Sequence, residues 1–170
     1  MAKIASIMTD LFEDSEYTSP KEALEAAGHQ VVPVGLEKGA TVTGKSDGTE
    51  VEIEVGIDNA KGEDFDALLI PGGYSPDKIR KYEDVLNFVR HFAYKHKPIF
   101  TICHGPQLLV NADVLHGKDI TAVAQVAVDV KNAGANYFDE EVVIDSSGII
   151  SSRTPDDLPA FNKAIVDALK

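Results

Sequence analysis

Short apolar segments alternate along the chain with amphipathic ones, and this alternation limits the folds that the chain can adopt. The segment Pro-Ile-Phe-Thr-Ile at residues 98–102 is typical of a strand that is covered on both faces. Segments of this kind predict strands at residues 4–8, 30–36, 66–70, 98–102, 120–123, 142–145 and 149–152. Apolar side chains at helical spacing predict helices at residues 82–95, 107–112 and 127–133, and from residue 156 onward. Strand–helix alternation of this length predicts an α/β fold with a mostly parallel sheet and helices on both faces.

Capping and turn residues define two further segments. Ser19, Pro20 and Glu22 supply an N-cap, a first helical position and a capping box, so we expect a helix that begins there and ends at Gly28. Residues 37–54 are rich in Gly, Thr, Lys and Glu, and the turn sequence Lys-Ser-Asp-Gly at 45–48 precedes alternating apolar residues. We expect a small hairpin excursion there rather than a linker between domains.

Length, composition and charge bound the class of protein. A chain of 170 residues, 44% hydrophobic and 26% charged, is expected to form a single globular domain over residues 1–170. Its net charge of −12 repels phosphate backbones and anionic lipids, which excludes nucleic-acid binding driven by charge. The apolar stretch at the N-terminus is too short for a signal peptide. No apolar run approaches the roughly 18 residues of a membrane span. We therefore expect a soluble, cytoplasmic protein.

Cys103 is the only cysteine, so the chain can form neither an intramolecular disulfide nor a cysteine-rich zinc site. The four histidines other than His104 are not spaced as metal ligands; they are His29, His91, His96 and His116. The sequence contains no glycine-rich phosphate motif. We expect no metal and no cofactor.

The sequence Cys-His-Gly-Pro at residues 103–106 connects a predicted strand to a predicted helix. Gly105 permits a tight turn and Pro106 favours the first helical turn, so Cys103 is placed as in a nucleophile elbow. The free N–H groups and the dipole of a helix N-terminus favour an anion, so a thiol there ionises more easily. The alternative is an inert buried cysteine. His104 has three open interpretations: a general base, a backbone donor to the anion, or a residue that caps the helix.

Two other predicted strands end in residues suited to the same site. Gly72 and Gly73 follow the strand at 66–70, and their amides, with that of His104, are candidates for an oxyanion hole. The acidic segment at residues 12–16 follows the first strand. A carboxyl near a thiolate is pushed towards its protonated form and can then donate a hydrogen bond to the sulfur. The residues alone do not choose between Glu13 and Glu16 for this role, and we expect Asp14 to be a solvated loop acid.

These segments together resemble the DJ/ThiJ/PfpI superfamily, and the PfpI branch most. The resemblance is carried by Leu-Phe-Glu-Asp-Ser-Glu-Tyr at 11–17, Asp-Ala-Leu-Leu-Ile-Pro-Gly-Gly at 66–73, Ile-Cys-His-Gly-Pro-Gln at 102–107 and Ser-Arg-Thr-Pro-Asp-Asp-Leu at 152–158. It implies the flavodoxin-like, class I glutamine-amidotransferase-like fold, a three-layer sandwich.

The resemblance implies roles for the site residues. Cys103 corresponds to an oxidation-sensitive nucleophile, Glu16 to the buried acid that hydrogen-bonds its sulfur, and Glu13 to a second acid near the site. Gly73 and His104 correspond to the oxyanion-hole amides. In peptidase-like members His104 is also the base, oriented by an acid of a neighbouring subunit that falls at Asp77 here. A homodimer or hexamer with the site near a subunit interface is therefore implied.

Two departures from the family pattern weaken a peptidase interpretation. Some members carry a tyrosine after the helix that follows the nucleophile, where this chain has Thr-Ala-Val-Ala at residues 121–124. Asp77 is also shorter than the glutamate of those members, which shortens its reach to His104. Arg153, in the last motif, is expected to anchor the final helix rather than to bind a substrate carboxylate.

We expect a stress-related, cysteine-dependent hydrolase of the deglycase or glyoxalase type, acting on methylglyoxal or glyoxal adducts. One alternative is an intracellular cysteine peptidase that uses Cys103, His104 and Asp77 of a neighbouring subunit. The other is a non-enzymatic, redox-responsive or chaperone-like stress protein, in which oxidation of the thiol is the event that matters.

Overall fold

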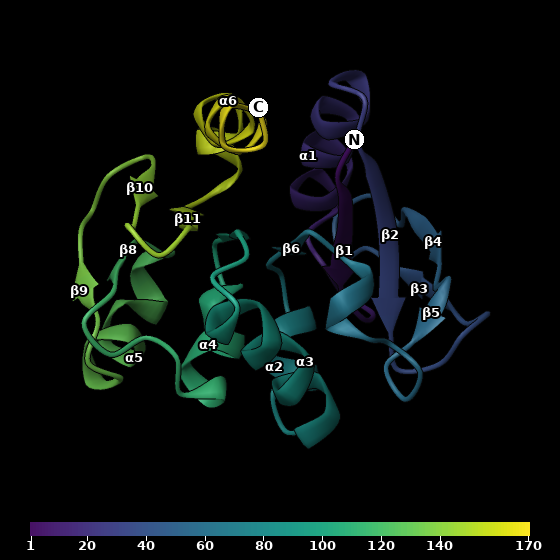
Figure 1. Cartoon of the computed structure of the whole chain (residues 1–170), viewed down its shortest axis with the longest axis horizontal. Coiled ribbons are helices and arrows are strands. Elements are labelled where there is room, and N and C mark those ends of the chain that lie inside the picture. The colour runs from purple at the N-terminus through teal and green to yellow at the C-terminus, as the bar shows by residue number, and fades with distance from the viewer.

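A seven-stranded sheet crosses the centre of the computed structural model, which describes residues 1–170 (Figure 1). Its strands are β1 (Lys3–Ile7), β2 (Gln30–Gly35), β5 (Val55–Gly56), β6 (Ala67–Ile70), β7 (Ile99–Ile102), β10 (Val143–Ile144) and β11 (Ile149–Ser152). They lie in the order β10-β11-β7-β6-β1-β2-β5, and β10 alone runs antiparallel to its neighbour. Counted along the chain, the five long parallel strands have the order 2-1-3-4-5, which is the flavodoxin-like arrangement.

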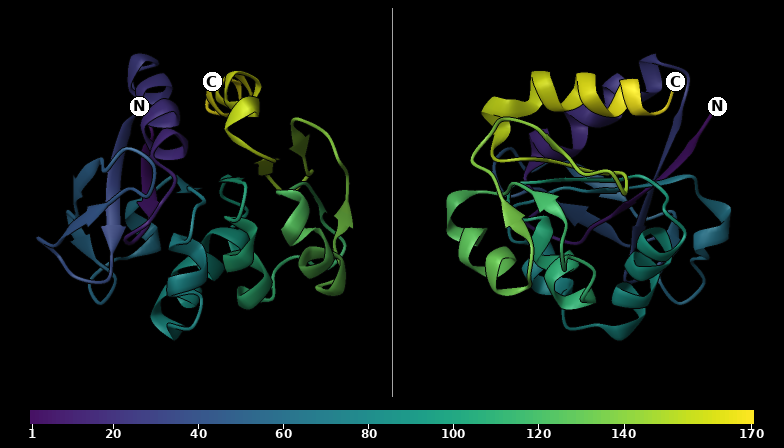
Figure 2. Two further views of the ribbon diagram at one scale, coloured as in Figure 1. Left: turned by 180° about the vertical axis from the view of Figure 1, so that it is seen from behind. Right: turned by 60° about the vertical axis from the view of Figure 1, so that its left-hand side comes forward.

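Helices cover both faces of the sheet (Figure 2). On one face α1 (Asp14–Ala26) packs beside α6 (Leu158–Ala168). The other face is covered by α2 (Ser75–Ile79), α3 (Glu83–Tyr94), α4 (Pro106–Ala112) and α5 (Ala127–Asn132). The predicted three-layer α/β fold is confirmed. None of these helices combines the length and the apolar character that a membrane crossing requires.

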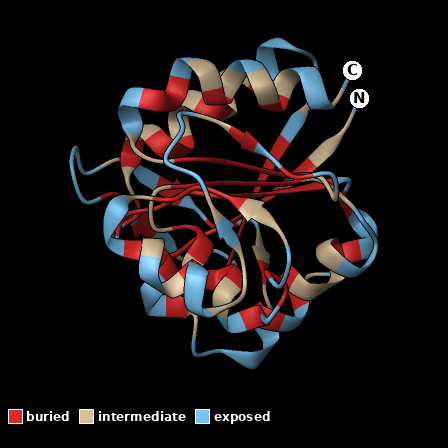
Figure 3. Ribbon diagram, turned by 90° about the vertical axis from the view of Figure 1, so that its left-hand side faces the viewer, coloured by how far each residue is buried: buried red, intermediate tan, exposed pale blue.

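The buried hydrophobic residues form two clusters, one on each face of the sheet. Figure 3 shows the buried positions along the strands and on the helices of both outer layers. Alternate residues of a strand point to opposite faces, so Ile99 joins the cluster under α3 and α4 while Phe100 and Ile102 join the cluster under α1 and α6. In the second cluster Phe100 lies opposite Leu69 of β6. Burial on both faces explains why the segment 98–102 is apolar almost throughout.

Two small sheets stand apart from the main one. β3 (Thr41–Thr43) and β4 (Glu50–Glu52) form the predicted antiparallel hairpin. β8 (Asp119–Ile120) pairs with β9 (Asn136–Tyr137), so the strand predicted at 120–123 is shorter than expected and lies outside the main sheet. Beyond Ile120 the N–H of Thr121 donates to the hydroxyl of Ser151 and the N–H of Val123 to the carbonyl of Cys103, so these residues do not pair as a strand. Short 3-10 helices lie at Gly62–Asp64, Ala124–Val126 and Pro155–Asp157.

The predicted start of the first helix is wrong. Helix α1 begins at Asp14, with Glu13 as its N-cap residue, and Pro20 lies inside it. Because proline has no N–H, the carbonyl of Glu16 lacks its helical partner there. The early start places the acidic side chains of Asp14 and Glu16 in the first turn, where the helix dipole favours negative charge.

Candidate active site

The motifs at the strand ends meet at one edge of the sheet, beyond the carboxyl ends of β1, β6 and β7. Strand β1 has β2 on one side and β6 on the other, so the direction in which the sheet grows reverses between β1 and β6. In open α/β sheets, ligands bind at such a switch point. The site therefore lies where this fold places ligands.

Cys103 occupies a sharp turn between β7 and α4. Its φ of 62° lies in the left-handed region, which is rare for a residue with a side chain and costs about 1–3 kcal/mol. Two hydrogen bonds hold this backbone, because the N–H of Cys103 donates to Ser152 and its carbonyl accepts from Val123, both at 3.1 Å. At Gly105 a Cβ would lie 2.7 Å from the carbonyl oxygen of Ile70, so the turn has no room for a side chain. The predicted strand–turn–helix geometry is observed.

The glycine pair after β6 runs directly beside the cysteine. Gly73 forms an antiparallel bridge with Phe12, and its φ of 77° suits glycine. A Cβ at Gly72 would lie 2.9 Å from the Cβ of Cys103 and 3.0 Å from the backbone nitrogen of His104. Glycine is needed at position 72 because the two loops approach so closely.

Glu16 is fully buried against this loop. Its Oε1 accepts the N–H of Gly72 at 2.8 Å, and its Oε2 has no hydrogen-bond partner. Burial raises the pKa of Glu16 to about 8, although the Gly72 amide stabilises the charged form; the nearby charge of Glu13 raises the pKa further. At neutral pH Glu16 therefore carries a proton, which it can donate to the thiol of Cys103.

The sulfur of Cys103 is surrounded by groups with opposing effects. Burial raises its pKa, and the ionised carboxylate of Glu16 adds to this, whereas the backbone N–H groups of His104 and Gly73 lower it; the result is a pKa of about 12. The expectation that the thiol of Cys103 has a lowered pKa is therefore wrong when Glu16 is charged. That expectation considered the helix N-terminus but left out the burial of the sulfur and the negative charge of Glu16. Protonation of Glu16 removes that like charge and leaves the two amides in place.

The ring of His104 turns back to the sulfur, with its Nδ1 3.3 Å from Sγ. Burial lowers the pKa of His104, and the charge of Lys45 lowers it further, while Asp77 raises it. A neutral imidazole at this distance can accept the thiol proton. Asp77 lies on α2, a helix that the pattern did not predict; its side chain is 65% exposed and contacts Arg80 at 3.4 Å. It makes no hydrogen bond to His104 within the chain.

Glu13 and Asp14 hold the tip of the β3–β4 hairpin against the site. Asp14 is buried, so the expectation of a solvated acid is wrong: its carboxylate accepts the N–H groups of Ser46 and Thr49, both at 2.9 Å. Glu13 accepts the hydroxyl of Ser46 at 3.0 Å and forms an ion pair of 2.7 Å with Lys45. The sequence pattern missed Lys45, because a turn sequence predicts a hairpin tip without indicating what the tip packs against.

Arg153 anchors the start of the last helix, as expected. Its guanidinium donates to both carboxylate oxygens of Asp157, each at 3.0 Å, and to Asp139 at 3.1 Å. Together with residues 122–125 it lines a pocket of about 500 Å³ beside the cysteine turn. Tyr137 also lines this pocket, so an aromatic ring is present there although residues 121–124 supply none. No group of three or more His, Cys, Asp or Glu side chains is placed to hold a metal ion.

The strand order and the site together define a flavodoxin-like α/β protein with a cysteine at the turn between β7 and α4. A buried carboxyl, an imidazole and two backbone amides face the sulfur of that cysteine. The family model described as DJ-1/PfpI family matches residues 2–168, and the chain belongs to this family.

Relatives of known name cover almost the whole chain. Over 161 residues the chain is 51% identical to "Protein/nucleic acid deglycase 2" of Escherichia coli (strain K12), covering 95% of this chain and 94% of that protein. It is 49% identical to "General stress protein 18" of Bacillus subtilis (strain 168), with the same coverage. It is 52% identical over 168 residues to "Putative cysteine protease YraA" of the same strain, covering 99% and 98%.

Among solved structures, a two-domain protein of Anabaena variabilis with DJ-1/ThiJ/PfpI-like and ferritin-like domains superposes with a TM-score of 0.95. It is 36% identical to this chain, and the match covers 98% of this chain and 49% of that one. The similarity supports the family assignment.

Proposed function

We propose that the protein is a stress-related, cysteine-dependent hydrolase of the deglycase or glyoxalase type, which acts on methylglyoxal or glyoxal adducts in the cytoplasm. The observation that carries the proposal is the set of groups around one thiol: His104 Nδ1 at 3.3 Å from Sγ and the buried carboxyl of Glu16. The relative named as a deglycase supports a deglycase-type activity, and the relative named as a general stress protein supports a stress-related role.

The chemistry begins with addition of the Cys103 sulfur to the aldehyde carbon of methylglyoxal, while the thiol proton passes to His104 and then to the new alkoxide oxygen. The hydrogen on that carbon next moves, as a proton, to the neighbouring ketone carbon, and the hydroxyl proton of the adduct passes to the ketone oxygen, so that the first carbon becomes the thioester carbonyl and the second carries a hydroxyl. One carbon is thereby oxidised and the other reduced, and a lactoyl thioester forms without an external oxidant. Water hydrolyses the thioester to lactate and restores the thiol. Neutral His104 and protonated Glu16 are the two groups placed to move these protons.

Turnover of methylglyoxal by the purified protein tests this proposal. The Cys103→Ala variant is expected to lose at least about 10²-fold in rate, because the proposed reaction proceeds through an adduct of the only thiol in the chain. Equal rates for the wild type and Cys103→Ala would show that the thiol does not carry the reaction. Production of lactate, measured by chromatography, separates turnover from simple trapping of the aldehyde by protein amines.

Oxidation of Cys103 is proposed as an accompanying property. A thiol beside two amide donors and a protonated carboxyl can be oxidised to a sulfinate that these donors stabilise. No second cysteine exists to form a disulfide with the oxidised residue. After mild peroxide treatment, mass spectrometry should find about +32 Da on the peptide that contains Cys103. A thiol that stays unmodified would exclude the redox role.

A peptidase is the second candidate, favoured by the exposed carboxylate of Asp77 and by the relative named as a cysteine protease. Asp77 makes no hydrogen bond to His104 of its own chain. In this proposal it instead orients the His104 of a neighbouring subunit in a homodimer or hexamer. Cleavage of unfolded casein that disappears in Cys103→Ser, and weakens in Asp77→Asn, would favour a peptidase over a deglycase.

A further inference from the structure

Lys45, at the tip of the β3–β4 hairpin, is fixed by contacts to the segments that build the site. Its Nζ lies 2.7 Å from Oε2 of Glu13 and 5.9 Å from the centroid of the Tyr74 ring. Its backbone N–H donates to the carbonyl of Phe12 at 2.9 Å. The carboxylate of Asp14 holds the rest of the tip. A lysine in a hairpin turn is ordinarily free to move, whereas this one has a defined place.

That place is beside Cys103. The N–H of Glu13 donates to the carbonyl of Gly72 at 3.1 Å, and Tyr74 directly follows Gly73, so both side chains that contact the ammonium group belong to loops that border the thiol. The charge of Lys45 accordingly acts on both Cys103 and His104. In a protein of net charge −12, the site therefore has a local cation.

The ammonium group of Lys45 can still bind a ligand. It has three N–H donors, and the ion pair with Glu13 engages one of its hydrogens. The side chain remains 33% exposed, so solvent and small molecules reach it. Two donors and a partly compensated positive charge are thus available near the thiol.

We propose that Lys45 forms an anion subsite beside Cys103, which binds a carboxylate or another negatively charged oxygen of the substrate or product. The inference rests on the proposed function in one respect, namely that Cys103 is the reacting group. The proposed reaction turns a neutral dicarbonyl into a carboxylate, so a cation at this position stabilises the charge that develops. Substrates that already carry a carboxylate next to the aldehyde carbon are favoured in the same way.

Alkylation of Cys103 by two reagents of similar size tests the subsite without any turnover assay. Iodoacetate is anionic and iodoacetamide is neutral, and the ratio of their second-order rates is independent of the thiolate fraction. Lys45→Met should lower this ratio roughly threefold to tenfold relative to the wild type, the effect of one partly exposed charge at close range. Lys45→Arg, which keeps the charge, should stay within about twofold of the wild type.

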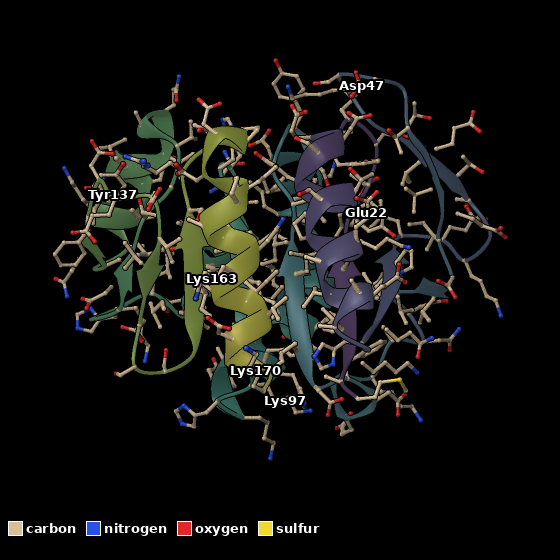
Figure 4. The ribbon with its side chains drawn as sticks, turned by 90° about the horizontal axis from the view of Figure 1, so that it is seen from above. Glu22, Asp47, Lys97, Tyr137, Lys163 and Lys170 are labelled. Carbon is tan, nitrogen blue, oxygen red and sulfur yellow. The ribbon has the colours of Figure 1, made fainter.

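Lys170→Met is the matched control, because it changes the net charge by the same amount. Figure 4 shows Lys170 at the opposite end of the molecule from Asp47, which lies two residues beyond Lys45 in the hairpin tip. For Lys170→Met, the ratio of the iodoacetate rate to the iodoacetamide rate should equal that of the wild type. If Lys45→Met and Lys170→Met give the same ratio, the subsite does not exist.

Glu13→Gln supplies a change of opposite sign and also decides the matter if Lys45→Met does not fold. Removal of the carboxylate leaves the ammonium charge uncompensated, so the iodoacetate-to-iodoacetamide ratio should rise; an unchanged or lower ratio overturns the proposal. Failure of the proposed function looks different, since an unreactive Cys103 is alkylated by neither reagent in any variant.

Discussion

Replacing Glu16 by glutamine should change how the stability of the protein depends on pH. An ordinary glutamate has a pKa of 4.5, whereas burial raises that of Glu16 to about 8 in the folded protein. Between these values the unfolded chain loses the proton and the folded protein keeps it. The free energy of unfolding should therefore fall by about 1.4 kcal/mol for each pH unit across this window. The stabilisation that comes from the raised pKa of Glu16 is on the order of 5 kcal/mol in total. It is fully present below pH 4.5 and lost above pH 8.

Urea unfolding at pH 5, 6, 7, 8 and 9, at one fixed protein concentration, measures this dependence. Glutamine has the same shape and does not titrate, so the difference between wild type and Glu16→Gln isolates the carboxyl from all other groups. Glu22→Gln is the matched control, because Glu22 is an exposed glutamate on the same helix (Figure 4) and is solvated in both states. The reasoning would be refuted if the difference in the free energy of unfolding between the wild type and Glu16→Gln stayed constant within about 1 kcal/mol from pH 5 to pH 8.

Three further changes have defined outcomes. At pH 9 to 10, Glu16→Gln should raise the rate of Cys103 alkylation by iodoacetamide about tenfold for each unit by which the thiol pKa drops, because the like charge is gone; slower alkylation would contradict this cause. Gly72→Ala should lower the free energy of unfolding by about 1–3 kcal/mol, since its methyl group would lie 2.9 Å from the Cβ of Cys103; a thermal midpoint equal to that of the wild type would argue against so close an approach. Asp14→Asn should destabilise the protein by about 1–3 kcal/mol at pH 7. Burial raises the pKa of Asp14, but the N–H donors of Ser46 and Thr49 overcome this and lower it to about 2, so the deficit should shrink as the pH falls below 4 and should be visible in chemical denaturation.

The elements that rest on local patterns were predictable from the sequence. The strand at 98–102 is apolar because both of its faces are buried, and the turn at Cys103 follows from the need for Gly105 where no side chain fits. The Gly72–Gly73 pair was predictable for a related reason. Two backbones that approach closely require glycine, and the glycines are visible in the sequence. The residues that determine such features lie within a few positions of one another in the sequence.

The features that were missed depend on segments distant in the sequence. Asp14 is buried because it binds Ser46, 32 positions away, and no nearby residue reveals that partner. The same contact helps to set the start of α1, which the capping residues at Ser19 and Pro20 placed too late. The pKa of Cys103 was misjudged because the helix terminus is a local property, whereas burial and the charge of Glu16 come from the folded whole.

The β3–β4 hairpin has a consequence for how such a site can diversify. Its two strands pair only with each other, yet its tip reaches the site through Glu13 and Asp14. Substitutions at tip positions such as Lys45 change the charge near the thiol and leave the pairing of the seven-stranded sheet untouched. Under the proposal that Lys45 binds anions, selection can therefore alter ligand preference at this position while the pairing of the main sheet is conserved.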